Sequence, residues 1–162
     1  MLYVIPKGAH YARGLNFRPH FGRSMSFLAT LTPSCVHPAR NSDDFDISKV
    51  AGFSGILTWR NSIRLGWRIS RKPDDLGPLE VWAYFHVRGK HHEVYLANVM
   101  PGHPVRCNLY DEGKAYRVEI VTCGRLRAAR IEKPWTFPAG FRMFPYFGGN
   151  NTAPQDIRIV VE

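Results

Sequence analysis

From residue 55 onward the sequence alternates between apolar and polar residues with a period of two. The clearest stretch is residues 62–69, whose apolar phase consists of Ile63, Leu65, Trp67 and Ile69. Successive side chains of a β-strand point to opposite faces of a sheet, so this alternation is typical of half-buried strands. Turn residues interrupt it at the short intervals that are typical of sandwiches. The pattern therefore predicts an all-β fold, a two-sheet antiparallel sandwich with little helix.

The composition points the same way. Aromatic residues make up 13% of the chain, which also contains 14 glycines and 12 prolines. Aromatic side chains suit strands, whereas Gly and Pro are unfavourable inside helices and suit tight turns. The 162 residues fit one domain, and no repeat, low-complexity segment or long linker divides them. We expect a single sandwich domain over residues 1–162.

Individual elements follow from the alternation. Residues 79–87 and 92–99 predict a hairpin around Gly89, and residues 43–50 predict one helical turn with an Asp as its N-cap. Weaker patterns predict strands at residues 1–5, 25–31 and 157–161. In the strand that follows Cys123 and Gly124, we expect Leu126 and Ala128 to face the core, with Arg130 as a further candidate. The predicted inter-sheet core consists of Ile63, Leu65, Trp67, Val81, Phe85, Val94, Leu96, Val118, Ile120, Phe141, Ile157 and Ile159.

The chain is strongly basic, with a formal net charge of +9 and an isoelectric point near 9.8. Such a charge attracts polyanions, including nucleic acid, acidic polysaccharide and anionic lipid, and it also suits a merely solvated surface. Arg outnumbers Lys among the basic residues, and the guanidinium group favours bidentate contacts with carboxylate or phosphate. No stretch is long and apolar enough to predict a membrane span.

Cys35, Cys107 and Cys123 are odd in number and lack the spacing of a zinc ribbon, so we expect three unbridged thiols. The N-terminus lacks the basic region and apolar run of a secretory signal. The sequence thus predicts a cytoplasmic protein.

The polar phases of the strands predict an aromatic and charged sheet face. Sugar rings stack on Trp and Tyr, while Arg, Glu and His bond their hydroxyl and carboxylate groups. Alternatively, cross-strand pairs stabilise this face without any ligand, or residues 1–50 cover it. Glu93, Glu119, Arg142 and Tyr146 share its phase. The candidate ligand-binding residues are Arg64, Arg68, Glu80, Trp82, Tyr84, His86, Tyr95 and Arg117.

Metal and nucleotide sites are not predicted. His91 and Glu93 have the spacing of a zinc deaminase motif, but the paired cysteines that this chemistry needs are absent. Asp43, Asp44 and Asp46 lack the spacing and the Glu of a calcium loop. No glycine-rich phosphate loop or nucleophile elbow occurs, so we expect no metal and no cofactor.

The C-terminal residues 144–159 contain a Gly-Gly pair at 148–149 and an Ala-Pro-Gln-Asp step at 153–156. This ending resembles the final hairpin of small uncharacterised bacterial β-sandwich proteins. More distantly, it resembles the last turn of concanavalin-like, jelly-roll polysaccharide lyases and lectins. The resemblance covers about the last 25 residues. It implies the jelly-roll form of the sandwich and a bacterial source, and it carries no catalytic residue across, because Gly148, Gly149, Pro154 and Asp156 have structural roles of their own.

Three functions fit these observations. The leading hypothesis is a non-enzymatic carbohydrate-binding or interaction module that uses the face around Trp82 and Tyr84. The second is a lyase or hydrolase of acidic glycans. In it, Tyr84 or Tyr95 would donate a proton, His86 would act as base, and Arg64 or Arg117 would neutralise the substrate carboxylate. The third is a nucleic-acid-binding protein that combines Arg with stacking aromatics. The ligand and the oligomeric state are not predicted.

Overall fold

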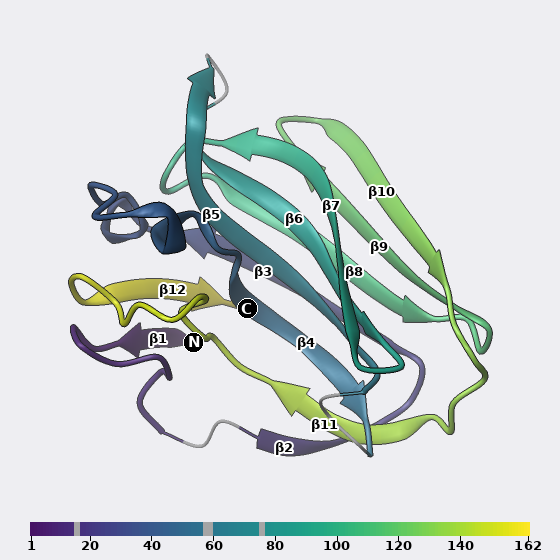
Figure 1. The fold of residues 1–162 in the computed structure, drawn as a ribbon. Coiled ribbons are helices and arrows are strands. Elements are labelled where there is room, and N and C mark those ends of the chain that lie inside the picture. Colours follow the sequence, from purple (N-terminus) through teal and green to yellow (C-terminus); the bar gives the residue numbers. More distant parts are fainter. Residues whose placement is uncertain (15–16, 57–59, 75–76) are drawn as a thin grey trace.

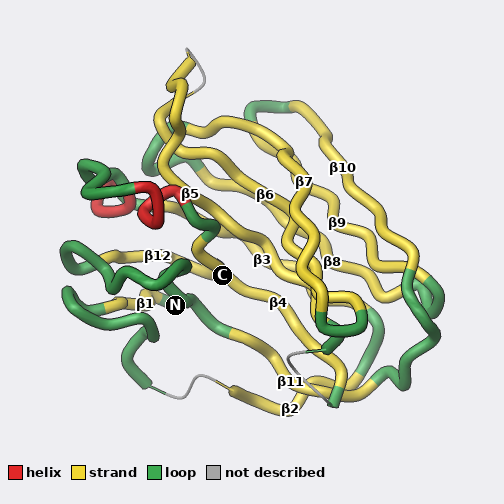
Figure 2. The backbone as a smooth tube through the Cα atoms, viewed as in Figure 1, coloured by secondary structure: helices red, strands yellow, loops and turns green. Residues whose placement is uncertain are grey.

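The computed structural model describes residues 1–14, 17–56, 60–74 and 77–162. Two antiparallel sheets of six strands each pack face to face (Figure 1). Helical structure in these residues is limited to two short 3₁₀ turns, Pro33–Cys35 and Ser42–Phe45, so strands and loops make up nearly the whole trace (Figure 2). No helix among the described residues is long and apolar enough to cross a membrane. The predicted fold class, a two-sheet antiparallel jelly-roll sandwich with little helix, is confirmed.

Sheet A contains both ends of the chain. The Met1 ammonium group donates a hydrogen bond of 2.7 Å to the carbonyl of Val161, which ties the N-terminus to the last strand. The strand predicted at residues 1–5 therefore exists and lies at the edge of this sheet. In spatial order, sheet A consists of β1 (Leu2–Ile5), β12 (Ile157–Val161), β3 (Ser24–Leu31), β8 (Pro104–Asp111), β9 (Ala115–Thr122) and β10 (Arg125–Glu132).

Sheet B contains the strongest sequence alternation. The predicted hairpin is confirmed: β6 and β7 pair through a tight turn in which Arg88 and Gly89 both have positive φ, as a two-residue hairpin turn requires. In spatial order, sheet B consists of β2 (Phe17–Phe21), β11 (Ala139–Met143), β4 (Ser48–Gly55), β5 (Ser62–Asp74), β6 (Gly77–Val87) and β7 (Lys90–Val99).

The core between the sheets contains ten of the twelve predicted residues. Val94 and Phe141 are the exceptions. Val94 is 39% exposed because the first part of β7, an edge strand, extends beyond the cover of sheet A. Phe141 is only half-buried and pairs with Pro19 of the edge strand β2. The confirmed residues are Ile63, Leu65, Trp67, Val81, Phe85, Leu96, Val118, Ile120, Ile157 and Ile159.

The predicted phase of β10 was wrong. Leu126 lies opposite the exposed Val121 and is itself 59% exposed, whereas Ala129 lies opposite the buried Val118 and is buried. The turn between β9 and β10 sets this register, because Cys123 and Gly124 both adopt positive φ and pair Arg125 with Thr122. The inward phase of β10 is therefore the one that also carries Arg125 and Arg127.

The helical turn predicted within residues 43–50 is displaced. The 3₁₀ turn covers Ser42–Phe45, and its N-cap is Asn41, whose side chain accepts a hydrogen bond of 3.0 Å from the Asp43 amide. Asp44 does not act as the cap, because its carboxylate binds the Arg40 guanidinium at 2.7 Å. From Ser48 onward the chain belongs to β4, and this places Lys49 in sheet B.

The three cysteines are free thiols. Cys35 and Cys107 are buried, and Cys123 is exposed in the turn between β9 and β10.

Candidate functional site

The outer face of sheet B, opposite the core, brings together seven of the eight predicted ligand-binding residues. On β5 and β6 the core takes one phase of the alternation, so the other phase points outward. The antiparallel register then places Arg64 beside Tyr84, and the edge strand β7 adds Tyr95 next to Trp82. The seven residues on this face are Arg64, Arg68, Glu80, Trp82, Tyr84, His86 and Tyr95.

Arg117 is the residue that does not join them. It lies on β9 in sheet A, where its guanidinium binds the carboxylates of Glu112 and Glu119 and lies 4.2 Å from the centre of the Tyr110 ring. Its outward phase was predicted correctly, but β9 belongs to the other sheet, so Arg117 faces the opposite side of the sandwich.

One half of the sheet B face is a closed network around Glu80. Its carboxylate accepts hydrogen bonds from Arg68 Nε at 2.6 Å, from Trp82 Nε1 at 3.0 Å and from Ser70 Oγ at 3.0 Å. The Arg68 guanidinium lies 4.3 Å from the centre of the Trp82 ring, and Tyr95 packs edge-on against that ring. The charges here neutralise one another, so this half stabilises the sheet.

The other half differs, because its cations form no ion pair among the described residues; Glu93 and Asp46 act on Lys49 only from beyond pairing distance, where they raise its pKa. Arg64 and Lys49 are only 9% and 8% exposed. Among the described residues, no carboxylate forms an ion pair with either of them. Instead, Lys49 Nζ lies 4.3 Å from the centre of the Tyr84 ring and 5.5 Å from that of Tyr146, and Arg64 Cζ lies 5.4 Å from the Tyr84 ring. We call Lys49, Arg64, Tyr84, His86 and Tyr146 the cationic cluster.

Hydrogen bonding inside the cationic cluster is incomplete. Lys49 Nζ donates to the carbonyl of Ile47 at 2.6 Å. Arg64 Nη2 donates to His86 Nδ1 at 3.3 Å, but Arg64 Nε is buried without a hydrogen-bond partner. A buried donor that lacks a partner costs free energy. The unpartnered donor therefore lowers the stability of the fold, and such unfavourable local arrangements are common at functional sites.

The electrostatics of the cluster follow from burial. Burial, helped by the positive charge of Arg64, lowers the pKa of Lys49 to about 8. Burial and the charges of Arg64 and Lys49 lower the pKa of His86 to about 4. Since a guanidinium can only donate, His86 Nδ1 is an acceptor and the neutral ring carries its proton on Nε2. His86 thus offers an N–H donor, and its lone pair is already directed toward Arg64.

Two tyrosines border the cations. Burial raises the pKa of both Tyr84 and Tyr146, so both remain neutral phenols at pH 7. Tyr146 lies between Tyr11, which packs edge-on at 5.0 Å between ring centroids, and His10, which stacks at 5.4 Å. Backbone bridges from Tyr146 to Tyr11 and to Lys49 hold this N-terminal segment beside β4. Residues 9–12 therefore flank the face beside Tyr146, and among the described residues the ring contacts of Trp82 come from Arg68 and Tyr95 of its own sheet.

A glycine makes room for Arg64. Gly52 lies opposite Arg64 on the neighbouring strand β4, and a Cβ atom at position 52 would lie 2.7 Å from Arg64 Cγ and 2.1 Å from the carbonyl oxygen of Ile63. Only glycine allows the backbone to approach this closely.

Sequence reasoning missed Lys49, Tyr11 and His10. Lys49 was hidden because all but the last residue of β4 is buried, so the strand shows no alternation, and because residues 43–50 were assigned to a helical turn. Tyr146 was recognised as sharing the polar phase, but its position beside Lys49 depends on an isolated bridge that no periodicity signals. No group of three or more metal-binding side chains occurs among the residues that the structure describes.

Neither a protein-family model nor a curated protein matches this chain. Among solved structures, the chain is similar to the alginate lyase from Klebsiella pneumoniae, with a TM-score of 0.61, 9% sequence identity, and coverage of 91% of this chain and 58% of the lyase. It thus spans little more than half the length of that enzyme. A scytalido-glutamic peptidase follows with a TM-score of 0.57, 9% identity, and coverage of 91% and 79%. The alginate lyase from Alteromonas sp. 272 has a TM-score of 0.52, 9% identity, and coverage of 100% and 85%.

At this level of identity the similarity shows the fold alone. The chain shares a jelly-roll sandwich with two alginate lyases and with a peptidase of different chemistry. The resemblance to polysaccharide lyases inferred from the C-terminal residues is therefore supported at the level of the fold. A fold hosts many functions, so function has to be argued from the site.

Proposed function

We propose that this protein binds an acidic glycan on the outer face of sheet B, with a sugar carboxylate held by Arg64 and Lys49. The observation that carries the proposal is the burial of two cations that have no carboxylate partner among the described residues. Buried charges are normally paired, because desolvation is costly. A ligand carboxylate would supply the missing anion and accept a hydrogen bond from the unpartnered Arg64 Nε.

The neighbouring groups suit a sugar better than a small inorganic anion. Tyr84 is 8% exposed and packs against Lys49, Arg64 and His91, so it is the half-buried Tyr146 that offers aromatic surface beside the cations. The Nε2–H of His86 and the two phenols can bond ring hydroxyls. Alginate is the first probe to try, since two proteins of this fold are alginate lyases.

A nucleic-acid interface is less well supported by the arrangement of arginines. Arg117 and Arg130 on sheet A are bound to Glu112, and each is also bound to a second Glu. A continuous stripe of unpaired arginines, which would favour a polyanionic backbone, is thereby interrupted on that face.

The test is calorimetric titration with alginate oligosaccharides, using mannose oligosaccharides of the same length as a control that lacks carboxylates. Charge-assisted hydrogen bonds contribute about 1.5–3 kcal/mol, so Arg64→Gln should weaken alginate binding about 10- to 100-fold. Arg158→Gln removes the same charge from an exposed position on β12 of sheet A, and it should bind like the wild type. Equal affinity for the neutral oligosaccharides, or full binding by Arg64→Gln, would refute the proposal.

A second candidate function is β-elimination on the same glycan, and the low pKa of Lys49 favours it. Neutral Lys49 would remove the proton next to the sugar carboxylate, Arg64 would neutralise that carboxylate, and Tyr84 would protonate the departing glycosidic oxygen as the C=C bond forms. His86 is a poor base here because its Nδ1 lone pair already accepts from Arg64. Prolonged incubation with alginate should then yield an unsaturated product that absorbs in the ultraviolet. Binding without that product would leave the protein a non-enzymatic binding module.

A further inference from the structure

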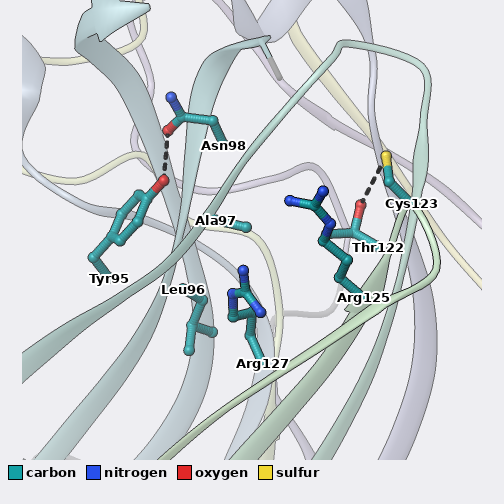
Figure 3. A pocket seen from close by; sticks show the side chains of 8 residues that line it. All are labelled: Tyr95, Leu96, Ala97, Asn98, Thr122, Cys123, Arg125 and Arg127. Carbon is teal, nitrogen blue, oxygen red and sulfur yellow. Dashed lines mark hydrogen bonds between the residues drawn. The ribbon is translucent and has the colours of Figure 1, made fainter. Parts of the chain in front are cut away.

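A pocket of about 200 Å³ lies where the edge strands β7 and β10 of the two sheets come together. Figure 3 shows its side chains: those of β7 line one side, and those of the end of β9, the following turn and β10 line the other. The pocket lies at the open edge of the sandwich, and none of the residues of the cationic cluster line it. The residues that line it are Tyr95, Leu96, Ala97, Asn98, Thr122, Cys123, Arg125 and Arg127.

Two arginines occupy the core-facing phase of β10. Arg125 and Arg127 lie opposite Thr122 and Ile120, which are both buried, and the next residue of this phase is the buried Ala129. An inward phase is normally apolar, so two guanidinium groups there break the rule that the rest of the sheet follows. Both side chains are exposed, because β10 is an edge strand that is incompletely covered, and both line the pocket.

The charges of these two arginines are not compensated. Arg127 Nη1 donates to the carbonyl of Leu126 at 3.2 Å, and within the described ranges neither Arg125 nor Arg127 forms an ion pair. Arg130 on the outward phase of the same strand differs, because Glu112 and Glu132 both bind it. Arg125 and Arg127 therefore present exposed guanidinium groups to the pocket without a carboxylate to pair them among the described residues.

The opposite side of the pocket is partly polar and partly apolar. Asn98 is only 7% exposed, and its Oδ1 accepts a hydrogen bond of 3.2 Å from the Tyr95 hydroxyl. The amide nitrogen of Asn98 makes no hydrogen bond within the described part of the chain, and it points away from Tyr95 in Figure 3. Leu96 and Ala97 provide an apolar surface beside it.

We propose that this pocket binds a small phosphate monoester. Two guanidinium groups match the nearly double negative charge of a phosphate monoester and its several acceptor oxygens. The organic part would lie against Leu96 and Ala97. The volume corresponds to several water molecules, which suits a ligand of this size. This site is independent of the proposed glycan site, because none of the residues of the cationic cluster lines it.

Titration with glycerol phosphate tests the proposal, with glycerol and glycerate as controls. Glycerol phosphate should bind saturably at millimolar concentrations or below, glycerol should not bind, and glycerate should bind more weakly. The variants Arg125→Gln and Arg127→Gln should each reduce affinity about 10- to 100-fold, whereas Arg158→Gln and Arg64→Gln should not change it. Absence of binding by the wild type, equal binding of glycerate, or unchanged binding by the double Arg125→Gln/Arg127→Gln variant would overturn the proposal.

Cys123 provides an independent readout of the same event. It lines the pocket and is exposed, while Cys35 and Cys107 are buried, so alkylation of the folded protein should occur at Cys123. Bound glycerol phosphate should slow this alkylation in the wild type and leave its rate unchanged in the double variant. An alkylation rate that does not respond to glycerol phosphate in the wild type would also contradict the proposal.

Discussion

At the scale of single residues, Arg64 is incompletely bonded and Arg68 is fully paired, although both lie on one face of β5, four positions apart. Arg64 is a buried cation whose Nε has no partner, whereas Arg68 is paired with Glu80 at 2.6 Å and stacked on Trp82. Replacing a poorly compensated buried charge by an apolar side chain of similar length often stabilises a protein. We therefore predict that Arg64→Met raises the free energy of unfolding by roughly 1 kcal/mol while it abolishes glycan binding.

The matched variant Arg68→Met should act in the opposite direction. It leaves the buried Glu80 without its ion-pair partner, so the free energy of unfolding should fall. Urea unfolding of both variants, followed by tryptophan fluorescence, checks the two signs together. If both variants lost stability to a similar extent, Arg64 would be an ordinary structural residue and the argument for its functional role would fail.

At the scale of secondary structure, the contact between β4 and β5 depends on Gly52. A Cβ atom there would lie 2.1 Å from the Ile63 carbonyl oxygen, so the strands would have to separate. Overpacking of this kind costs about 1–3 kcal/mol, and we predict that Gly52→Ala destabilises the fold by that amount and displaces Arg64. Gly55→Ala on the same strand is the control, because its Cβ would have only a backbone oxygen at 3.9 Å nearby. Thermal melts that rank the two variants in the reverse order would contradict this account.

The same strands explain which parts of the structure could be predicted. β5 and β6 are central strands whose inner face is covered over residues 63–69 and 79–85, so their alternation gives the core residues and the outward phase of the other residues correctly. β7 and β10 are edge strands that the opposite sheet covers incompletely. Val94 is therefore exposed, and the inward phase of β10 can contain Arg127. A prediction that assigns apolar residues to the core is consequently wrong in part on these two strands. Sheet membership is a further obstacle, since alternation gives the phase of Arg117 but not its sheet.

At the scale of the whole molecule, histidines make stability depend on pH. Burial lowers the pKa of His20, His37 and His86 from the ordinary value of 6.5, and that of His86 falls to about 4. At pH values between the folded and the unfolded pKa of these histidines, the unfolded chain binds protons that the folded chain does not. The free energy of unfolding therefore falls as the pH drops through this range. The contribution is complete above pH 6.5 and is lost on acidification toward pH 4.

The pH range in which histidines affect stability lies above the range in which carboxylates do. The pKa values of Asp44 and Glu112 are also lowered in the fold, by Arg40 and by Arg130 and Arg117 respectively, but these groups reduce stability only as the pH approaches their unfolded values of 3.8 and 4.5. We therefore predict a clear fall in melting temperature between about pH 7 and about pH 5.

The variant His20→Phe isolates one contributor to this fall. Its ring would keep the packing against Phe53, 4.6 Å away between centroids, and would remove a buried Nε2 that has no partner. The melting temperature of His20→Phe should depend less steeply on pH, whereas His103→Gln, at an exposed position, should follow the wild type. A wild-type melting temperature that stays constant from about pH 7 to about pH 5 would mean that these histidines accept protons in the folded state as readily as in the unfolded one.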